Sequence, residues 1–211
     1  MSLRWKIAQA AEIRWWQNYL KKRPKADYLI WKRKYWKTLL SRLNLTILRG
    51  EKVLDAGCGP AGIFMVLEEF QTDAMDPLLD DYEKKLDHFS KSQYPNVRFF
   101  NEPLETFSPN ERYKKVFCLN AINHVADLDL CFDKLVDFTA DGGTMIVSID
   151  AHNFTFFKKI FRVLPGDILH PHQFNLEEYQ RMIIDRGCKL EQSILYREDF
   201  FFNYYILIFT K

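Results

Sequence analysis

The feature that most constrains this chain is a short apolar strand that runs into an acidic residue and then into a glycine-rich turn. It spans residues 53–63 and reads Val-Leu-Asp-Ala-Gly-Cys-Gly-Pro-Ala-Gly-Ile. Glycine at positions 57 and 59 lets the backbone turn sharply and lets a ligand approach it without a Cβ in the way. A helix after the turn would offer free N–H groups and a positive dipole end. The pattern therefore predicts a nucleotide-binding loop.

Two kinds of nucleotide fit such a loop. Gly57-x-Gly59-x-x-Gly62 loosely matches the dinucleotide fingerprint, with Asp76 as the later acidic residue that would bind a ribose. Asp55 argues against a dinucleotide, because a carboxylate there suits a cationic amino group. Pro60 also removes a backbone donor from the turn that would hold a pyrophosphate. A ligand with an ammonium, a carboxylate and a ribose but no phosphate fits better, and S-adenosylmethionine is such a ligand.

At this point a family resemblance is visible. Residues 55–62 resemble motif I of the class I S-adenosylmethionine-dependent methyltransferases, and further segments resemble that family in the same order. These are residues 74–77 at the end of the second strand, 97–104 with the adenine-side turn, 116–125 with the loop after the fourth strand, and 141–147 leading into the fifth strand. The resemblance covers about residues 50–211 and says little about the methyl acceptor.

The resemblance implies a set of residues around the cofactor. Gly57 and Gly59 would lie along its methionine end, Asp55 would hold the ammonium through water, and Asp76 would bind the ribose. Asp76 would also cap the next helix, with Pro77 at the first helical position. Glu102 would face the adenine amino group, where the family often has an aspartate. The full implied set is Asp55, Gly57, Cys58, Gly59, Asp76, Pro77, Glu102, Leu104 and Asn120.

Composition limits the class of protein. The chain is 47% hydrophobic and 27% charged, as in an ordinary globular protein, and 211 residues suit one domain with a small appendage. No apolar run reaches the roughly 20 residues that a membrane-spanning helix needs, and Arg4, Lys6 and Glu12 interrupt any signal-peptide pattern. The four cysteines show no metal-ligand spacing. We expect a cytoplasmic protein that binds no metal.

Charge is unevenly distributed along the chain. Residues 1–50 contain 13 Lys and Arg against two acids, whereas residues 51–211 contain 17 against 26, and all five tryptophans lie in the first segment. Apolar spacing and Pro24 predict two helices there, over 3–21 and 25–43. We therefore expect residues 1–48 to form a basic, Trp-rich helical arm or lid, and residues 49–211 to form the cofactor-binding domain.

The rest of the chain alternates strands and helices, which predicts an α/β fold. We expect a doubly wound, mostly parallel seven-stranded sheet with an antiparallel last strand. The expected strands are 52–56, 72–76, 97–101, 115–120 and 144–150, followed by a hairpin of 188–196 and 201–210. The expected helices are 61–70, 78–90, 128–138 and 176–186, the last capped by Asn175. A cap insert over 151–175 contains many Phe, His and Pro residues.

Three histidines are the candidates for contact with a methyl acceptor: His124, His170 and His172. Methyl transfer needs a base only if the acceptor must lose a proton, and histidine serves that purpose near neutral pH. The alternatives are that His124 supports its loop and that His152, His170 and His172 order the insert. A metal interpretation of His170 and His172 lacks a third ligand.

Three functions remain open from the sequence. The first is methyl transfer to a small-molecule or lipid-like acceptor, apolar or anionic. The second is nucleic-acid methylation in which the basic arm grips phosphates, for which Lys21-Lys22-Arg23 and Lys32-Arg33-Lys34 are the evidence. The third is a non-catalytic binding module on the same fold. The basic, Trp-rich arm would also suit peripheral contact with anionic lipid.

Overall fold

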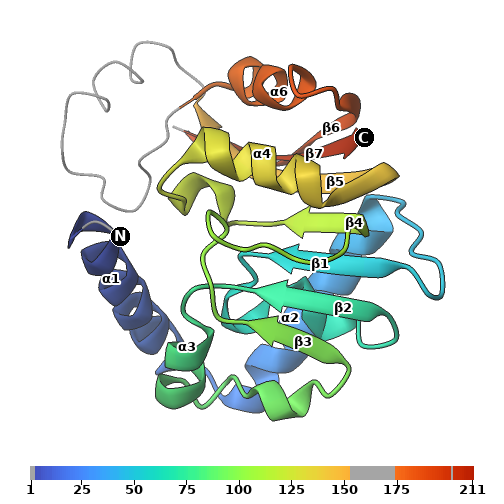
Figure 1. Cartoon of the computed structure of the whole chain (residues 1–211). Coiled ribbons are helices and arrows are strands. Elements are labelled where there is room, and N and C mark those ends of the chain that lie inside the picture. The colour runs from blue at the N-terminus through green and yellow to red at the C-terminus, as the bar shows by residue number, and fades with distance from the viewer. Residues whose placement is uncertain (1–2, 153–173, 201) are drawn as a thin grey trace. The chain divides into compact units, whose positions relative to one another are not determined.

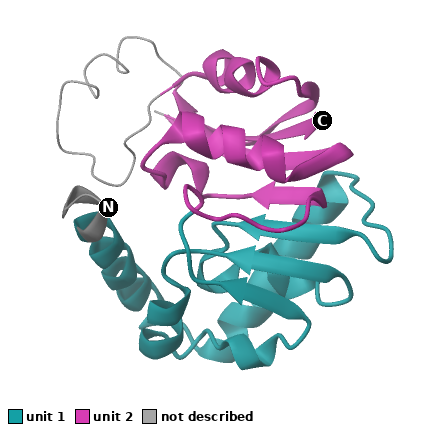
Figure 2. Ribbon diagram, viewed as in Figure 1, with its two compact units in different colours: residues 1–103 teal, residues 104–211 magenta. Residues whose placement is uncertain are grey.

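The computed structural model describes residues 3–152, 174–200 and 202–211. The chain divides into two compact units, residues 1–103 and 104–211 (Figure 2). Each unit is built around part of a seven-stranded sheet: the first contributes strands in the order β3-β2-β1, and the second contributes β4-β5-β7-β6.

The first unit begins with two helices and continues with three parallel strands. Its elements are α1 (Leu3–Leu20), α2 (Lys25–Arg42), β1 (Lys52–Ala56), η1 (Gly59–Ala61), η2 (Ile63–Val66), β2 (Gln71–Met75), α3 (Leu79–Lys85), η3 (Lys91–Gln93) and β3 (Val97–Phe100). The last four residues of β1 and of β2 are buried, as expected for parallel strands covered on both faces. Helix α1 lies on the side to which the arrowheads of β1 and β2 point (Figure 1).

The second unit carries the antiparallel part of the sheet. Its elements are β4 (Tyr113–Cys118), η4 (Ile122–His124), α4 (Leu128–Phe138), β5 (Thr139–His152), α6 (Leu176–Ile184), β6 (Lys189–Arg197) and β7 (Phe202–Thr210). Strand β5 pairs with β4 in parallel and with β7 antiparallel, and β7 forms the predicted hairpin with β6. These pairings confirm the mostly parallel sheet with an antiparallel last strand.

Local sequence explains where the helices of this unit begin. Asp127 caps α4 by accepting the N–H of Leu130 at 3.0 Å. Asn175 caps α6 as predicted, since its Oδ1 accepts the N–H of Glu178 at 2.9 Å. The Glu178 carboxylate in turn accepts the Asn175 N–H at 2.8 Å, which completes a capping box.

The prediction of a helix over residues 61–70 is wrong. Two short 3₁₀ helices stand there instead, η1 and η2, separated by the extended Gly62 (ψ −176°). The reason is visible in the pattern: Ile63, Phe64 and Met65 are all buried, so the segment has no polar face of the kind that an amphipathic helix presents. Pro60 lies in the first turn of η1, and the extended Gly62 ends it.

The largest remaining differences from the predicted boundaries are in α3 and β5. Helix α3 starts at Leu79 and ends at Lys85, well before Ser90, because Leu86 is extended. Strand β5 starts at Thr139 rather than Thr144, with a register shift opposite Tyr113 and Lys115. Within the described residues, no helix combines the length and the apolar character that a membrane crossing requires.

Candidate cofactor site

The glycine loop begins where β1 ends. The N–H groups of Gly57 and Cys58 donate to the carbonyl of Met75 at 2.8 and 3.0 Å, which ties the loop to the end of β2. Gly57 and Gly59 have φ values of +69° and +57°, a left-handed conformation that strongly favours glycine. The sharp turn that these two glycines predict is therefore confirmed. A Cβ on Gly59 would meet only Trp16, at 3.9 Å, so the loop is open at this point.

Asp55 lies beneath the loop and holds it in shape. Its carboxylate is 2% exposed and accepts the N–H of Phe64 at 3.0 Å. Burial raises the pKa of Asp55 to about 7, against the lowering effects of N–H donors at Phe64 and Ile63 and of the Lys32 ammonium. The role of Asp55 toward a cofactor ammonium stays a prediction. The structure adds a second role, which is to accept the N–H of Phe64 within the loop region.

Asp76 follows β2 and contacts the same loop. Its Oδ2 accepts the N–H of Gly59 at 3.0 Å, and its Oδ1 accepts the N–H of Leu78 at 2.9 Å. Burial first, and the Glu12 carboxylate second, raise its pKa to about 7. The prediction that Asp76 caps the next helix with Pro77 at its first position is wrong: Leu78 is the capping residue. The bond from Leu78 closes a turn at Asp76 and delays the helix.

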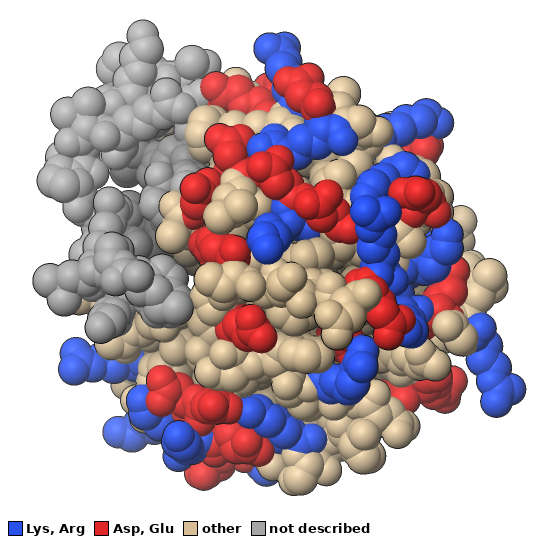
Figure 3. Space-filling model, in the orientation of Figure 1, with Lys and Arg blue, Asp and Glu red and all other residues tan. Residues whose placement is uncertain are grey.

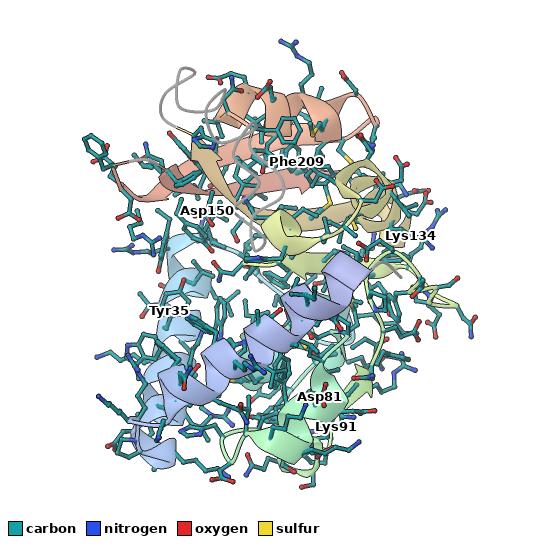
Figure 4. The ribbon with its side chains drawn as sticks, turned by 90° about the vertical axis from the view of Figure 1, so that its left-hand side faces the viewer. Tyr35, Asp81, Lys91, Lys134, Asp150 and Phe209 are labelled. Carbon is teal, nitrogen blue, oxygen red and sulfur yellow. The ribbon has the colours of Figure 1, made fainter. Side chains whose placement is uncertain are left out.

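Helix α1 adds two residues that the sequence reasoning missed. The Tyr82 hydroxyl on α3 donates to Oε1 of Glu12 at 2.8 Å, and Trp16 lies edge-on to Tyr82 with 6.4 Å between ring centroids. Figure 4 shows α1 crossing in front of the side chains of this unit. The only sequence signal for Glu12 is that it is one of two acids in an otherwise basic segment.

Helix α2 is fastened to the loop from another side. The indole N–H of Trp36 donates to the Ala61 carbonyl at 2.9 Å. The Arg33 guanidinium donates to the Met65 carbonyl and to Glu68, the latter at 2.7 Å. Lys32 precedes Arg33 on the helix, and its ammonium lies 4.8 Å from the ring centroid of Trp36. Burial lowers the pKa of Lys32 to about 8, and the Asp55 carboxylate opposes that shift.

Glu102 lies in the bend just after β3. It is half-buried, and the N–H of Asp76 donates to the carbonyl of Phe100, two residues before it, at 3.2 Å. Glu102 is thus in the segment that continues from the carboxyl end of β3, beside that of β2. Its assignment to an adenine amino group stays a prediction.

Two further predicted cofactor residues belong to the second unit. Leu104 is buried. Asn120 is exposed and follows β4 with a φ of +56°, while its N–H donates to the Ser148 hydroxyl at 2.7 Å. A left-handed asparagine is a mild form of backbone strain, of a kind that gathers at functional sites.

The histidine candidates separate in the structure. His124 lies in η4 and is exposed, and its contact with an acceptor stays a prediction. His152 belongs to β5 rather than to the insert; it is buried, and its ring lies 4.3 Å from that of Phe202. His170 and His172 lie outside the described residues. Among the residues that are described, no three His, Cys, Asp or Glu side chains gather as a metal site.

Asn123, beside His124, serves a structural purpose. Its amide donates to the Asp150 carbonyl at 3.2 Å and to the Tyr179 hydroxyl at 3.3 Å, and its oxygen accepts the Asp150 N–H at 3.4 Å. These bonds join η4 to β5 and α6. Asp150 is labelled in Figure 4.

Comparisons with known proteins agree with this geometry. A sequence model of the family described as methyltransferase domain matches residues 28–193. A search of the curated proteins found no match. Among solved structures, the chain is similar to the N-methyltransferase NodS from Bradyrhizobium japonicum WM9 in complex with S-adenosylhomocysteine, with a TM-score of 0.62 and 14% identity over 90% of this chain and 89% of that chain.

Two more structures show the range of reactions found on this fold. One is the 1,6-didemethyltoxoflavin-N1-methyltransferase of Burkholderia thailandensis with S-adenosylhomocysteine, at a TM-score of 0.58 and 14% identity over 96% of this chain and 89% of that one. The other is the [4+2]-cyclase SpnF, at a TM-score of 0.62 and 12% identity over 85% and 80%. At these identities the similarity establishes the fold alone.

Proposed function

The chain belongs to the methyltransferase-domain family, and from this premise we propose that it is an S-adenosylmethionine-dependent methyltransferase acting on a small-molecule or lipid-like acceptor. Because the fold is shared with a [4+2]-cyclase, the fold alone does not support methyl transfer. The support comes from the residues around the glycine loop.

The observation that carries the proposal is the charge at that loop. Asp55 and Asp76 are buried, both bond to N–H groups of the loop region, and Glu12 stands close enough to Asp76 to raise its pKa. A cationic, hydroxyl-bearing ligand would favour the ionised form of these carboxylates, whereas a pyrophosphate would be repelled by it. S-adenosylmethionine has that character, and when bound it supplies a methyl group on a sulfonium for in-line transfer.

The described residues suggest how the chain would hold this cofactor. Asp76 and Glu12 would accept hydrogen bonds from the ribose hydroxyls, and Asp55 would balance the ammonium. Gly57 and Gly59 would let the backbone approach the methionine end. Trp16 and the rest of α1 would form the lid that we expect from the N-terminal arm. The cytoplasmic location stays a prediction.

Calorimetric titration with S-adenosylmethionine and S-adenosylhomocysteine tests the proposal. We expect micromolar binding by the wild type and a loss of about 10- to 100-fold in Asp76→Ala, the effect of removing bonds to a charged acceptor. Asp80→Ala is the matched control, since Asp80 is an exposed aspartate that pairs with Lys91. Absence of binding by folded wild-type protein would refute the proposal.

Exposed apolar residues on the arm favour the lipid-like acceptor class. Ile30 is 67% exposed and Trp31 50%, and the exposed cation Lys34 lies close after them on α2. Nucleic acid is the alternative. The face in Figure 3 shows basic residues interspersed with acidic ones, and α2 with its basic residues lies behind the strands in that view.

Vesicle sedimentation separates these acceptor classes. We expect wild-type protein to sediment with vesicles containing anionic phospholipid more than with neutral vesicles, and Ile30→Ser/Trp31→Ser to lose most of that binding. Binding to RNA that the double substitution leaves unchanged, with no vesicle binding, would favour the nucleic-acid alternative instead.

A further inference from the structure

The junction between α1 and α2 carries a continuous row of aromatic rings. Trp15 stacks on Tyr19, with 4.8 Å between the ring centroids, and Tyr19 meets Tyr28 edge-on at 6.2 Å. Tyr28 continues the row to Trp31 at 5.8 Å, and Trp31 continues it to Tyr35 at 6.1 Å. Figure 4 labels Tyr35 on α2. Because each ring contacts the next, side chains from both helices form one aromatic row.

The aromatic row is buried in its middle and exposed at two points. Tyr28 is only 4% exposed, so it fixes the row to the rest of the unit. Trp15 and Trp31 are 51% and 50% exposed, and Ile30, which precedes Trp31 in the chain, is 67% exposed. Exposed apolar side chains that lie together, unlike scattered ones, mark an interaction surface.

The turn between the two helices is held in place. The Arg23 guanidinium lies 3.8 Å from the ring centroid of Tyr19 and donates to the Tyr19 carbonyl at 2.6 Å. The Arg23 carbonyl in turn accepts a hydrogen bond from Nε2 of His88 at 2.8 Å. The surface is therefore formed before any partner arrives, so a partner pays little ordering entropy to bind it.

Cations accompany the exposed rings. Residues 14–37 contain nine Lys and Arg and a single acid, Asp27. Lys21–Arg23 and Lys25, in and beside the turn, are all exposed. An apolar patch among basic residues is complementary to a partner that combines negative charge with an apolar layer, and an anionic phospholipid surface has both.

The way the rings are used favours lipid over nucleic acid. Base stacking needs the faces of aromatic rings, and one face of Trp15 is already covered by Tyr19, with 12° between the ring planes. One face of Trp31 is covered by Tyr35 in the same way, at 30°. Tryptophan edges suit the membrane interface, where the ring is apolar and its N–H stays hydrated. Ile30 gains by entering an acyl layer and has no ring to stack.

We propose that this surface docks the protein on anionic phospholipid bilayers, with Trp15, Ile30 and Trp31 entering the interface and the exposed cations meeting the headgroups. The inference goes beyond the proposed function, because docking does not depend on which acceptor is methylated. Trp16, next to Trp15, lies 3.9 Å from the position of a Cβ on Gly59. Docking would therefore bring the glycine loop to within about one helix diameter, roughly 10–12 Å, of the lipid.

Intrinsic fluorescence tests the contact directly, because all five tryptophans lie in residues 1–50. With Trp5→Phe as the common background, phosphatidylserine vesicles brominated on the acyl chains should quench the fluorescence, and brominated phosphatidylcholine vesicles should quench it far less. Trp15→Phe/Trp31→Phe keeps the apolar surface but removes the two exposed reporters. Vesicle binding should then persist while most of the quenching is lost, since Trp36 is only 3% exposed.

Sedimentation with phosphatidylserine vesicles measures the affinity. Trp15→Ser/Trp31→Ser should weaken binding about 10-fold or more, because the apolar contribution is lost. Lys22→Gln/Lys25→Gln should weaken it by about 10- to 30-fold and reduce its dependence on salt. Ile184→Ser is the matched control, since Ile184 is 44% exposed on α6 of the second unit, and it should change the affinity by less than about twofold.

The outcomes separate docking from the proposed function. Wild-type protein that binds S-adenosylmethionine but no anionic vesicle would overturn docking alone, and so would vesicle binding that Trp15→Ser/Trp31→Ser leaves unchanged. Binding of single-stranded RNA in place of vesicles would assign the surface to nucleic acid and also overturn the inference. Circular dichroism checks folding. If Trp15→Ser/Trp31→Ser is unstable, Ile30→Ser, which leaves the aromatic row intact, should still weaken vesicle binding.

Discussion

At the residue scale, two glycines of the loop differ in what they require. Gly62 has an ordinary φ of −74°, but a Cβ there would lie 2.4 Å from Oδ2 of Asp55 and 2.5 Å from the carbonyl of Cys58. Gly59 has a left-handed φ, with only Trp16 within 4 Å of an added Cβ. A side chain at position 62 is therefore disfavoured by lack of space, whereas a side chain at position 59 is disfavoured by the backbone conformation.

This difference predicts the order of two alanine substitutions. We expect Gly62→Ala to lower the free energy of unfolding by about 3 kcal/mol or more, because a buried carboxylate or the backbone must move. Gly59→Ala should cost about 1–2 kcal/mol, the cost of a left-handed alanine. Urea denaturation measures both, and an equal or reversed order would contradict the steric argument.

The buried aspartates Asp55 and Asp76 should make stability depend on pH. The pKa of each is about 7 in the folded protein, against about 3.9 in an unfolded chain. Between these values the folded state binds more protons than the unfolded state, so the free energy of unfolding falls as pH rises from about 4 to about 7 and then levels off. A pKa difference of one corresponds to about 1.4 kcal/mol, so each aspartate should contribute a few kcal/mol.

Asp76→Asn tests this dependence. Urea titrations across the same pH range should show a shallower slope in Asp76→Asn than in the wild type, whatever the change in absolute stability. Asp80→Asn is the control, because Lys91 lowers the pKa of Asp80 rather than raising it. Parallel pH curves for wild type and Asp76→Asn would show that Asp76 is ionised throughout.

At the scale of elements, α2 depends on one buried hydrogen bond. The Trp36 indole donates to the Ala61 carbonyl, and both residues are buried. Trp36→Phe keeps most of the apolar contact but leaves the carbonyl unpaired, so we expect a loss of about 1–3 kcal/mol in the free energy of unfolding. Trp31→Phe, on the half-exposed side, should change it by less than about 0.5 kcal/mol. Equal effects in chemical denaturation would count against the bond.

The sequence predicted most elements where local signals are strong. Helix α6 begins at Asn175 because a capping box has its own sequence signature, and α4 runs over 128–138 as predicted because its apolar residues recur at helical spacing. The helix prediction for residues 61–70 is wrong because Ile63, Phe64 and Met65 are uniformly buried. A short apolar run does not distinguish a helix from a tight turn. There the Asp55 carboxylate accepts the N–H of Phe64, nine residues later, and no helical or strand pattern encodes that bond.

At the scale of the whole molecule, ligand binding should raise thermal stability. A ligand at about 100 times its dissociation constant adds about 2.7 kcal/mol to the free energy of unfolding, which for a chain of this size shifts Tm by about 5–10 °C. Differential scanning fluorimetry with S-adenosylhomocysteine measures this. Asp76→Ala should show a much smaller shift at the same concentration, whereas Asp80→Ala should behave as the wild type. A Tm that saturating ligand leaves unchanged would contradict the cofactor assignment.

The contribution of α1 to the site was not visible from the sequence. Glu12 meets Tyr82 through a contact spanning 70 positions, and no local pattern encodes such a contact. The positions of Asp55, Gly57, Gly59 and Asp76 were predictable because a strand–turn pattern carries them on consecutive elements. Glu12 and Trp16 became candidates only when α1 was placed against that pattern.

The four cysteines have a practical consequence. All four cysteines are buried and none forms a disulfide: Cys58, Cys118, Cys131 and Cys188. Burial raises the pKa of the Cys58, Cys131 and Cys188 thiols. Such thiols react with alkylating reagents only when the surrounding structure opens. The alkylation rate at each cysteine therefore reports how often the surrounding region opens. Cys58 reports on the glycine loop in this way without any introduced label.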